Sequence, residues 1–291
     1  MNKSNTLQHS VIAGLLAGLL GGLVYAALSG LRVLPLVGNL ARISVPGIEL
    51  VLHLLISAAI GIGFGVFFRK LATTSGSGLM WGMAYGLLWW VAGQLTLVPL
   101  LLGGRPVWTI ETTRAAFPHL LGHLVGYGAV LGLAYVILSV TLSGGWQREH
   151  VRRVALAFVM AIFIGGLAGL VGGLAFGAWM ARVGFFPLVA GLMRSNSASV
   201  GRMLHFIISV IIGASYGALF RRDIRGIGSS IAWGVAYGLI WWILGPLTIM
   251  PWWLGQGVQW SLAAGQAAFP SLVGHVIYGI LLGVVYSMVD R

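Results

Sequence analysis

Long apolar runs separated by short polar segments are the dominant pattern along this chain of 291 residues. A helix needs about 20 mostly apolar residues to cross a bilayer, and eight runs reach that length. We expect membrane-spanning helices over residues 8–29, 48–68, 78–102, 117–140, 154–178, 203–220, 228–254 and 269–289. The pattern therefore predicts an all-α polytopic membrane protein.

The apolar pattern occurs twice. Residues 81–103 and 233–255 are identical at 14 of 23 positions, at an offset of 152 residues. Each copy holds four predicted spans, and an even number lets both copies enter the bilayer in the same orientation. We therefore predict two parallel-orientation four-helix repeats with pseudo-twofold symmetry about the membrane normal. The expected domains are a first transmembrane repeat at 1–142, a cytoplasmic linker at 143–152 and a second transmembrane repeat at 153–291.

Two longer connecting segments, 30–47 and 181–201, follow the first predicted span of each repeat. Each contains proline, arginine and apolar residues. Such a composition is typical of short interfacial helices or of partly re-entrant segments rather than of free loops. The sequence leaves these two alternatives open.

Composition supports the membrane assignment and indicates an orientation. Hydrophobic residues make up 58% of the chain and charged residues 8%, against roughly 25% charged in soluble domains. The chain has no cysteine, which excludes disulfides and thiolate metal sites. Its net charge is +12, and 10 of its 17 basic residues fall in short segments on the side of both termini. The positive-inside rule therefore predicts a multi-pass membrane protein with both termini in the cytoplasm.

Glycine is frequent and regularly spaced, with 45 residues in all. Gly165, Gly169, Gly173 and Gly177 recur at every fourth position and so lie on one helix face. Small residues at this spacing let two membrane helices approach closely, so we expect helix crossings there. The alternative is a substrate path along bare glycine backbone.

An aromatic row marks the third predicted helix of each repeat. The side chains recur at every fourth position and therefore share a helix face. One interpretation is packing with an interfacial anchor, and the other is an aromatic wall against a flat or lipid-like ligand. The rows consist of Trp81, Tyr85 and Trp89, and of Trp233, Tyr237 and Trp241.

Four histidines are the main candidates for a site, because ionisable residues within membrane spans are commonly functional. His53 and His123 each lie about six residues into parallel spans, so both imidazoles lie about 9 Å below the external end. His205 and His275 repeat this arrangement. We predict that each pair faces a common, apolar, aromatic-walled cavity open to the external side, without a metal ion. The alternatives are imidazoles that donate to backbone carbonyls, or paired ligation of haem or a metal.

Arg42 and Arg194 precede these histidines on the external side. They form either an anion or head-group site, or cations that extend to the lipid surface. The five acidic residues lie outside the deep parts of the spans, and no catalytic motif is present. The sequence therefore favours a non-enzymatic protein.

Each four-span unit resembles the YagU-like uncharacterised bacterial inner-membrane proteins. The motifs that carry the resemblance are an early-span histidine, a Trp-Gly helix with a Leu- and Pro-containing end, and a last helix that opens with Gly-His. In this chain they are His53, Trp81-Gly82, Leu95–Pro99 and Gly122-His123, with second copies at His205, Trp233-Gly234, Leu247–Pro251 and Gly274-His275. The resemblance implies a bacterial-type cytoplasmic (inner) membrane and no activity. The tandem duplication departs from a single four-span chain.

The sequence as a whole favours an integral membrane protein that binds or passes a small amphiphilic or anionic ligand near the external face, or a scaffold subunit of a membrane complex. The alternative is a haem- or pigment-binding redox or photosynthetic subunit that uses the paired histidines. We expect no cofactor in the first case. The expected partners are membrane lipids, an unidentified small molecule and, for a scaffold, other membrane subunits, but not nucleic acid.

Overall fold

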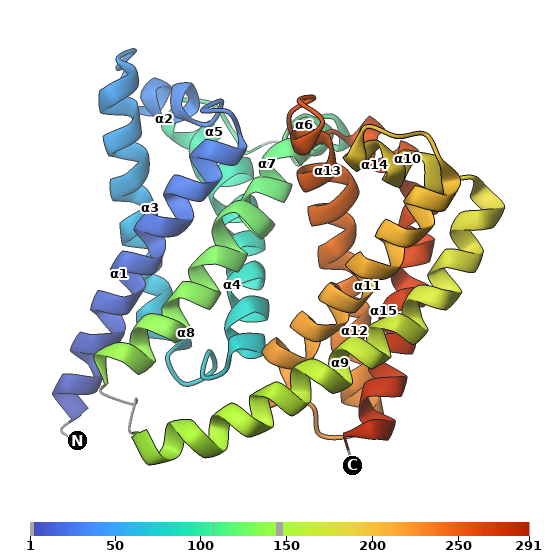
Figure 1. Ribbon diagram of the computed structural model, residues 1–291. Coiled ribbons are helices and arrows are strands. Elements are labelled where there is room, and N and C mark those ends of the chain that lie inside the picture. The colour runs from blue at the N-terminus through green and yellow to red at the C-terminus, as the bar shows by residue number, and fades with distance from the viewer. Residues whose placement is uncertain (1–2, 107, 144–147, 291) are drawn as a thin grey trace. The chain divides into compact units, whose positions relative to one another are not determined.

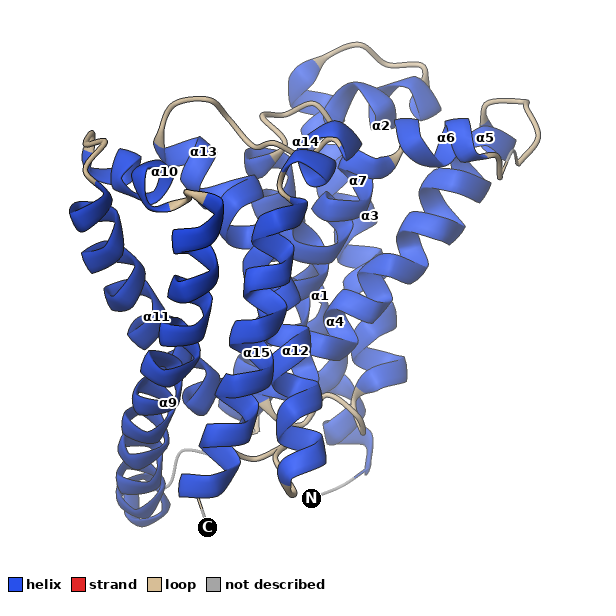
Figure 2. Cartoon of the chain, turned by 90° about the vertical axis from the view of Figure 1, so that its right-hand side faces the viewer, coloured by secondary structure: helices blue, strands red, loops and turns tan. Residues whose placement is uncertain are grey.

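The computed structural model describes residues 3–106, 108–143 and 148–290. All regular elements in these ranges are helices (Figure 1, Figure 2). Eight of these helices are long and apolar enough to cross a membrane, which confirms the predicted number of spans. They cover Leu7–Leu28, Pro46–Phe68, Ser75–Leu101, Phe117–Leu142, Ala155–Val183, Ala198–Phe220, Ile227–Trp253 and Phe269–Val289.

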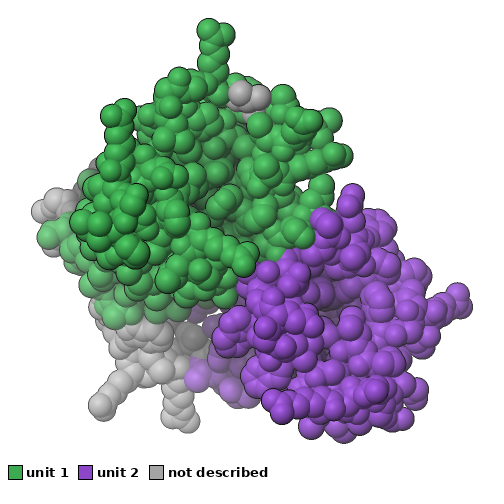
Figure 3. Space-filling model, turned by 90° about the horizontal axis from the view of Figure 1, so that it is seen from above, with its two compact units in different colours: residues 1–146, 260–262 green, residues 147–259, 263–291 purple. Residues whose placement is uncertain are grey.

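The chain forms two compact units (Figure 3). The boundary between them falls within the predicted linker at 143–152. Residues 144–147 of that linker lie outside the described residues, and residues 148–152 are helical because α9 begins at Arg148. The first unit consists of Met1–Trp146 with Trp260–Leu262, and the second of Gln147–Gln259 with Ala263–Arg291.

The first unit is a bundle of four long helical segments with short helices at one end. α1 packs against α3 and α8, and α4 packs against η2 and α8. The short helices α2, α5, α6 and α7 lie together at the end of this unit opposite the start of α1 (Figure 1, Figure 2). The elements are α1 (Lys3–Leu28), α2 (Leu34–Ala41), α3 (Pro46–Phe68), α4 (Ser75–Trp89), the π-helix η1 (Trp90–Leu97), α5 (Val98–Leu101), α6 (Ile110–Ala115), α7 (Phe117–Leu121), the π-helix η2 (Gly122–Ala129) and α8 (Val130–Leu142).

The second unit pairs its long helices in the same way, with α9 against α11 and α15, and α12 against α15. Its elements are α9 (Arg148–Val183), α10 (Phe186–Ala190), the 3₁₀-helix η3 (Gly191–Met193), α11 (Ala198–Phe220), α12 (Ile227–Leu244), the π-helix η4 (Gly245–Ile249), α13 (Met250–Trp253), α14 (Leu262–Ala267) and α15 (Phe269–Val289).

Local sequence explains where several of these helices begin. Thr74 and Ser77 form a capping box in which each side chain bonds the other's backbone N–H, so α4 starts at the next residue, Ser75. α3 and α15 each carry a proline in the first turn, where the missing N–H has no helical partner to lose. These starts lie close to those expected from the apolar runs.

Glycines permit the closest helix crossings. A Cβ atom on Gly169 would contact the carbonyl oxygen of Ser209 and lie 2.7 Å from the Cα of Gly213. In the first unit, a Cβ on Gly18 would contact the Ser57 carbonyl and lie 2.9 Å from the Cα of Gly61. The glycine spacing therefore serves helix packing, as the close-crossing interpretation predicts.

The two connecting segments, for which the sequence leaves interfacial helices and re-entrant segments open, contain short helices. Residues 30–47 contain α2, and residues 181–201 contain the end of α9, α10, η3 and the start of α11. α2 packs against α3, and α10 packs against α11. Each short helical stretch thus packs against a long helix.

The fourth long segment differs between the units by a single residue. We call two residues corresponding when they align between the two halves of the sequence. The offset is 151 residues in the first span and after Gly126, and 152 residues elsewhere. His123 and Tyr127 are four positions apart, whereas the corresponding His275 and Tyr278 are three apart. The first unit has η2 at this point, whereas α15 is a continuous α-helix. A π-turn takes up one extra residue, and the alignment identifies Gly126 as that residue.

Candidate functional site

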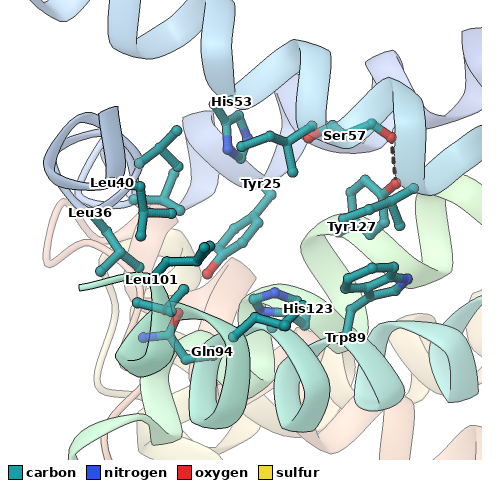
Figure 4. Close-up of a pocket in the computed structure, with 17 residues that line it drawn as sticks. Tyr25, Leu36, Leu40, His53, Ser57, Trp89, Gln94, Leu101, His123 and Tyr127 are labelled. Carbon is teal, nitrogen blue, oxygen red and sulfur yellow. Dashed lines mark hydrogen bonds between the residues drawn. The ribbon is translucent and has the colours of Figure 1, made fainter. Parts of the chain in front are cut away.

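A mostly apolar cavity of about 300 Å³ lies within the first unit, bordered by α1, α2, α3, η2 and the segment from α4 to α5 (Figure 4). Leu36 and Leu40 of α2 and Leu101 of α5 gather at one end of the cavity, with Gln94 beside them. The lining residues are Tyr25, Val33, Leu36, Val37, Leu40, His53, Ile56, Ser57, Ile60, Trp89, Gly93, Gln94, Leu97, Val98, Leu101, His123 and Tyr127.

His53 joins α3 to α1 and also reaches the cavity. Its side chain is 5% exposed, and Nε2 donates to the carbonyl oxygen of Gly22 at 3.0 Å. Because a carbonyl only accepts, Nε2 carries the proton and Nδ1 is an acceptor in the neutral ring. The corresponding His205 donates to Gly173 at 2.8 Å. The retention of this histidine therefore has a structural cause in both units.

His123 is held by its own helix. Its Nδ1 donates to the carbonyl of His119 at 2.7 Å, so Nε2 is left as an acceptor. The corresponding His275 donates to the Ser271 carbonyl at 2.8 Å. The two histidines of the first unit both line the cavity, as their equal depth predicts.

An aromatic ring lies between the two imidazoles of each unit. The ring centroid of Tyr25 is 6.0 Å from that of His53 and 5.3 Å from that of His123 (Figure 4). Phe176 occupies the corresponding place, 5.2 Å from His205 and 4.9 Å from His275. The paired histidines therefore do not fit ligation of an iron between them, because an aromatic side chain fills that space. Among the described residues, no three metal-ligating side chains form a group.

The aromatic row of the first unit contributes less to the cavity than the sequence suggests. Trp89 lines the cavity, but Trp81 and Tyr85 do not. Trp81 packs on Phe68 at 5.4 Å between ring centroids, and the buried Tyr85 donates to the Ile60 carbonyl. The expected wall of three aromatic side chains is thus wrong for this cavity, where the aromatic lining is Trp89 with Tyr25 and Tyr127.

The corresponding row in the second unit is also engaged in packing. Trp233 stacks on Phe220 at 5.1 Å between ring centroids. The Tyr237 hydroxyl hydrogen-bonds that of Ser215 at 2.7 Å, and Trp241 lies edge-on to Tyr237. The side chains of this row therefore pack against neighbouring residues of the second unit.

Arg42 and Arg194 lie apart from the histidines. Arg42 ends α2 and Arg194 ends η3, both in the left-handed conformation, at φ 56° and 52°. Both are exposed, and Arg42 does not line the cavity. The expected anion site formed by Arg42 and the histidines is therefore not assembled.

A second, more polar cavity of about 380 Å³ adjoins the first. Gln94 lines both cavities. His119 lines the polar cavity, and its Nδ1 hydrogen-bonds the hydroxyl of Tyr25, which lines the apolar one, at 3.0 Å. The residues of the polar cavity are Gln94, Leu95, Pro99, Arg105, Thr112, Ala115, Ala116 and His119.

Sequence reasoning missed Tyr25, Gln94, Arg105 and His119 as a group. The available signal was divergence rather than recurrence, because each residue differs in kind from its counterpart. The corresponding residues in the second half are Phe176, Pro246, Gly257 and Ser271.

Comparison with protein-family models, with curated proteins and with solved structures gives no significant match to this chain.

Proposed function

We propose that this chain is a non-enzymatic integral membrane protein whose first unit binds a small amphiphilic or anionic ligand near the external face. The observation that carries the proposal is the apolar cavity, into which Tyr25, His53, Gln94 and His123 bring polar atoms. Small-molecule sites are typically concave and mostly apolar, with a few polar groups that fix orientation. A volume of about 300 Å³ lies at the lower end of their usual range.

The polar groups of this cavity are able to accept a ligand's hydrogen bonds or donate to them. His123 presents Nε2 as an acceptor because its other nitrogen is bound to a carbonyl. The Gln94 amide forms no hydrogen bond with another described residue. An amphiphile could therefore place its chain among the leucines of α2 and its polar end toward Gln94.

The proposal includes the topology and the repeat. The short basic turns favour an orientation with both termini in the cytoplasm, so α2 and α5 belong to the external side. The resemblance to YagU-like proteins favours a bacterial-type cytoplasmic membrane. The matching contacts of His53 and His205 support two four-helix repeats, which we propose to be related by a pseudo-twofold axis along the membrane normal. Kinship with YagU-like proteins belongs to the same proposal and contributes no activity. No observation specifically favours the scaffold alternative.

Photocrosslinking tests ligand binding at this cavity. The protein in lipid nanodiscs is irradiated with an alkyne-tagged palmitate analogue that carries a diazirine on its chain, and labelled peptides are mapped by mass spectrometry. We expect labelling of residues 89–101 and competition by unlabelled palmitate. Gly93→Leu should remove most of this labelling, because an added Cβ meets only Trp89 at 3.6 Å and the side chain would extend into the cavity.

The matched control is Gly245→Leu at the corresponding position of the second unit, where an added Cβ meets only His275 at 3.9 Å. This variant should leave the labelling of residues 89–101 unchanged. Labelling that is uniform along the lipid-facing surface, or that survives Gly93→Leu, would contradict ligand binding in the cavity.

A further inference from the structure

The first unit holds two adjoining cavities of unlike character that share one wall. The apolar cavity beneath α2 and the polar cavity beside α6 and α7 are both lined by Gln94 of η1. The hydrogen bond between Tyr25 and His119 joins a residue of one cavity to a residue of the other. A single elongated ligand could therefore extend from one cavity into the other past Gln94.

We propose that the ligand is a single-chain amphiphile with an anionic head group, whose chain occupies the apolar cavity and whose head group binds Arg105 and His119. This inference rests on the proposed function and specifies the ligand class and its orientation. The head group is identified by its chemistry alone, as a carboxylate or a phosphate.

The charge of the polar cavity favours an anion. Arg105 is the only charged residue among those that line it, and no acidic residue lies in that set. Arg105 forms no ion pair with another described residue. A guanidinium binds carboxylates and phosphates through two parallel hydrogen bonds. His119 and the Gln94 amide place further polar atoms in the same cavity.

The second unit shows that these polar residues are not needed to hold the helices together. It makes the same inter-helix bonds through His205 and Tyr278, yet it has Gly257 and Ser271 in place of Arg105 and His119. A residue required for helix packing would be expected in both units, because the crossings are the same. The polar residues of the first unit therefore have a role other than packing.

The second unit also has a link between its short helices at the position that corresponds to the end of the apolar cavity. Trp253 stands where the first unit has Leu101, and its Nε1 donates to the carbonyl of Leu192 at 3.2 Å. Leu192 corresponds to Leu40, which lines the cavity of the first unit. Leu101 has no side-chain donor, so the corresponding hydrogen bond cannot form in the first unit.

The test varies the head group on a constant chain. Four alkyne-tagged diazirine probes, which carry a carboxylate, a monophosphate, an alcohol or an amine, are crosslinked to the full-length protein in nanodiscs of zwitterionic lipid. Labelling of residues 89–101 is measured against probe concentration. We expect a carboxylate or phosphate probe to half-saturate at about tenfold lower concentration than the alcohol, as a charge-assisted hydrogen bond implies. The better of the two anionic probes identifies the head group.

Substitutions then locate the head group. Arg105→Gln should remove the preference for the anionic probe and leave the alcohol probe within about twofold, because only the charged contact is lost. His119→Ser, which installs the second unit's residue, should weaken the anionic probe less. Arg114→Gln is the matched control, since Arg114 is exposed, lies outside both cavities and corresponds to Gln266. This variant should leave the half-saturating concentration of every probe unchanged.

Two results would overturn the inference. One is equal half-saturation by the anionic and alcohol probes in the unmodified protein, and the other is an unchanged anion preference in Arg105→Gln. Either result leaves ligand binding in the apolar cavity standing, provided that Gly93→Leu still abolishes labelling. Absence of labelling by all four probes contradicts the proposed function itself.

Discussion

The two units use the same contacts to hold their long helices and different residues around their short helices. Tyr127 and Tyr278 donate to the corresponding carbonyls of Ser57 and Ser209, each at 2.7 Å. Around the short helices the residues differ. For example, Tyr25 carries a hydroxyl group, whereas the corresponding Phe176 has none. Where two halves of a chain agree, the cause is packing, and where they diverge in polar residues, the divergence points to a role that only one half performs.

The single-residue difference in the fourth segment follows the same division. The side chains that form hydrogen bonds in η2 are the same as in α15, because His123 and Tyr127 of η2 correspond to His275 and Tyr278. The extra Gly126 packs against Tyr25, since a Cβ there would lie 3.2 Å from the Cα of Tyr25. π-turns of this kind are often found at functional sites, and this one adjoins the cavity.

The most severe test of the shared packing is a large side chain at a close crossing. Gly18→Leu and Gly169→Leu should each destabilise the protein by about 1–3 kcal/mol or more, because overpacking forces the crossing helices apart. Thermal unfolding in detergent measures the effect. Gly166→Ala is the control on the same helix, since its Cβ would meet only ordinary contacts, the nearest at 3.5 Å to Val210. A tolerated Gly169→Leu would break the packing argument.

The hydrogen bonds donated by Tyr127 and Tyr278 should contribute similar free energies to the stability of the two units. Tyr127→Phe and Tyr278→Phe each remove a buried hydrogen bond to a backbone carbonyl, for an expected loss of about 1 kcal/mol. Chemical denaturation of each variant, with the double variant for additivity, measures the loss. Markedly unequal values would show that the two units differ in packing as well as in their short-helix ends.

Deletion of Gly126 should convert η2 into α-helix and make the fourth segment of the first unit like α15. We expect the variant to fold, with a smaller fall in melting temperature than Tyr127→Phe causes, because the second unit keeps both hydrogen-bonding side chains without this residue. Labelling of residues 89–101 by the palmitate probe should fall, since the cavity wall at Tyr25 moves. A variant that fails to fold would mean that the two fourth segments are not interchangeable.

Tyr25→Phe installs the second unit's aromatic ring and should have the smallest effect on stability. It removes only the hydrogen bond to His119, whose Nδ1 would then face the polar cavity. The expected cost is about 0.5 kcal/mol, at the low end for a hydrogen bond. Melting temperature in detergent checks it, and a loss larger than that of Tyr127→Phe would assign Tyr25 a packing role that Phe176 cannot replace.

The prediction that the whole aromatic row of the first unit lines the cavity was wrong. Trp81, Tyr85 and Trp89 share a helix face, but eight residues of helix rise about 12 Å, so the row extends past the cavity. Trp89 reaches the cavity, while Trp81 packs on Phe68 near the far end of the unit. Periodicity predicts the direction of a side chain, and the depth of a cavity depends on the other helices.

The sequence by itself determined the eight helices, their approximate bounds and the glycine crossings, because apolar length and i+4 spacing are local properties of a chain. It also placed His53 and His123 at one depth, since helical rise converts sequence position into depth. Only the tertiary structure decided that Tyr25 of α1 separates these imidazoles and that Gln94 and His119 join two cavities. These residues come from different helices, and two π-turns shift the faces between them, so no spacing along the chain encodes their meeting.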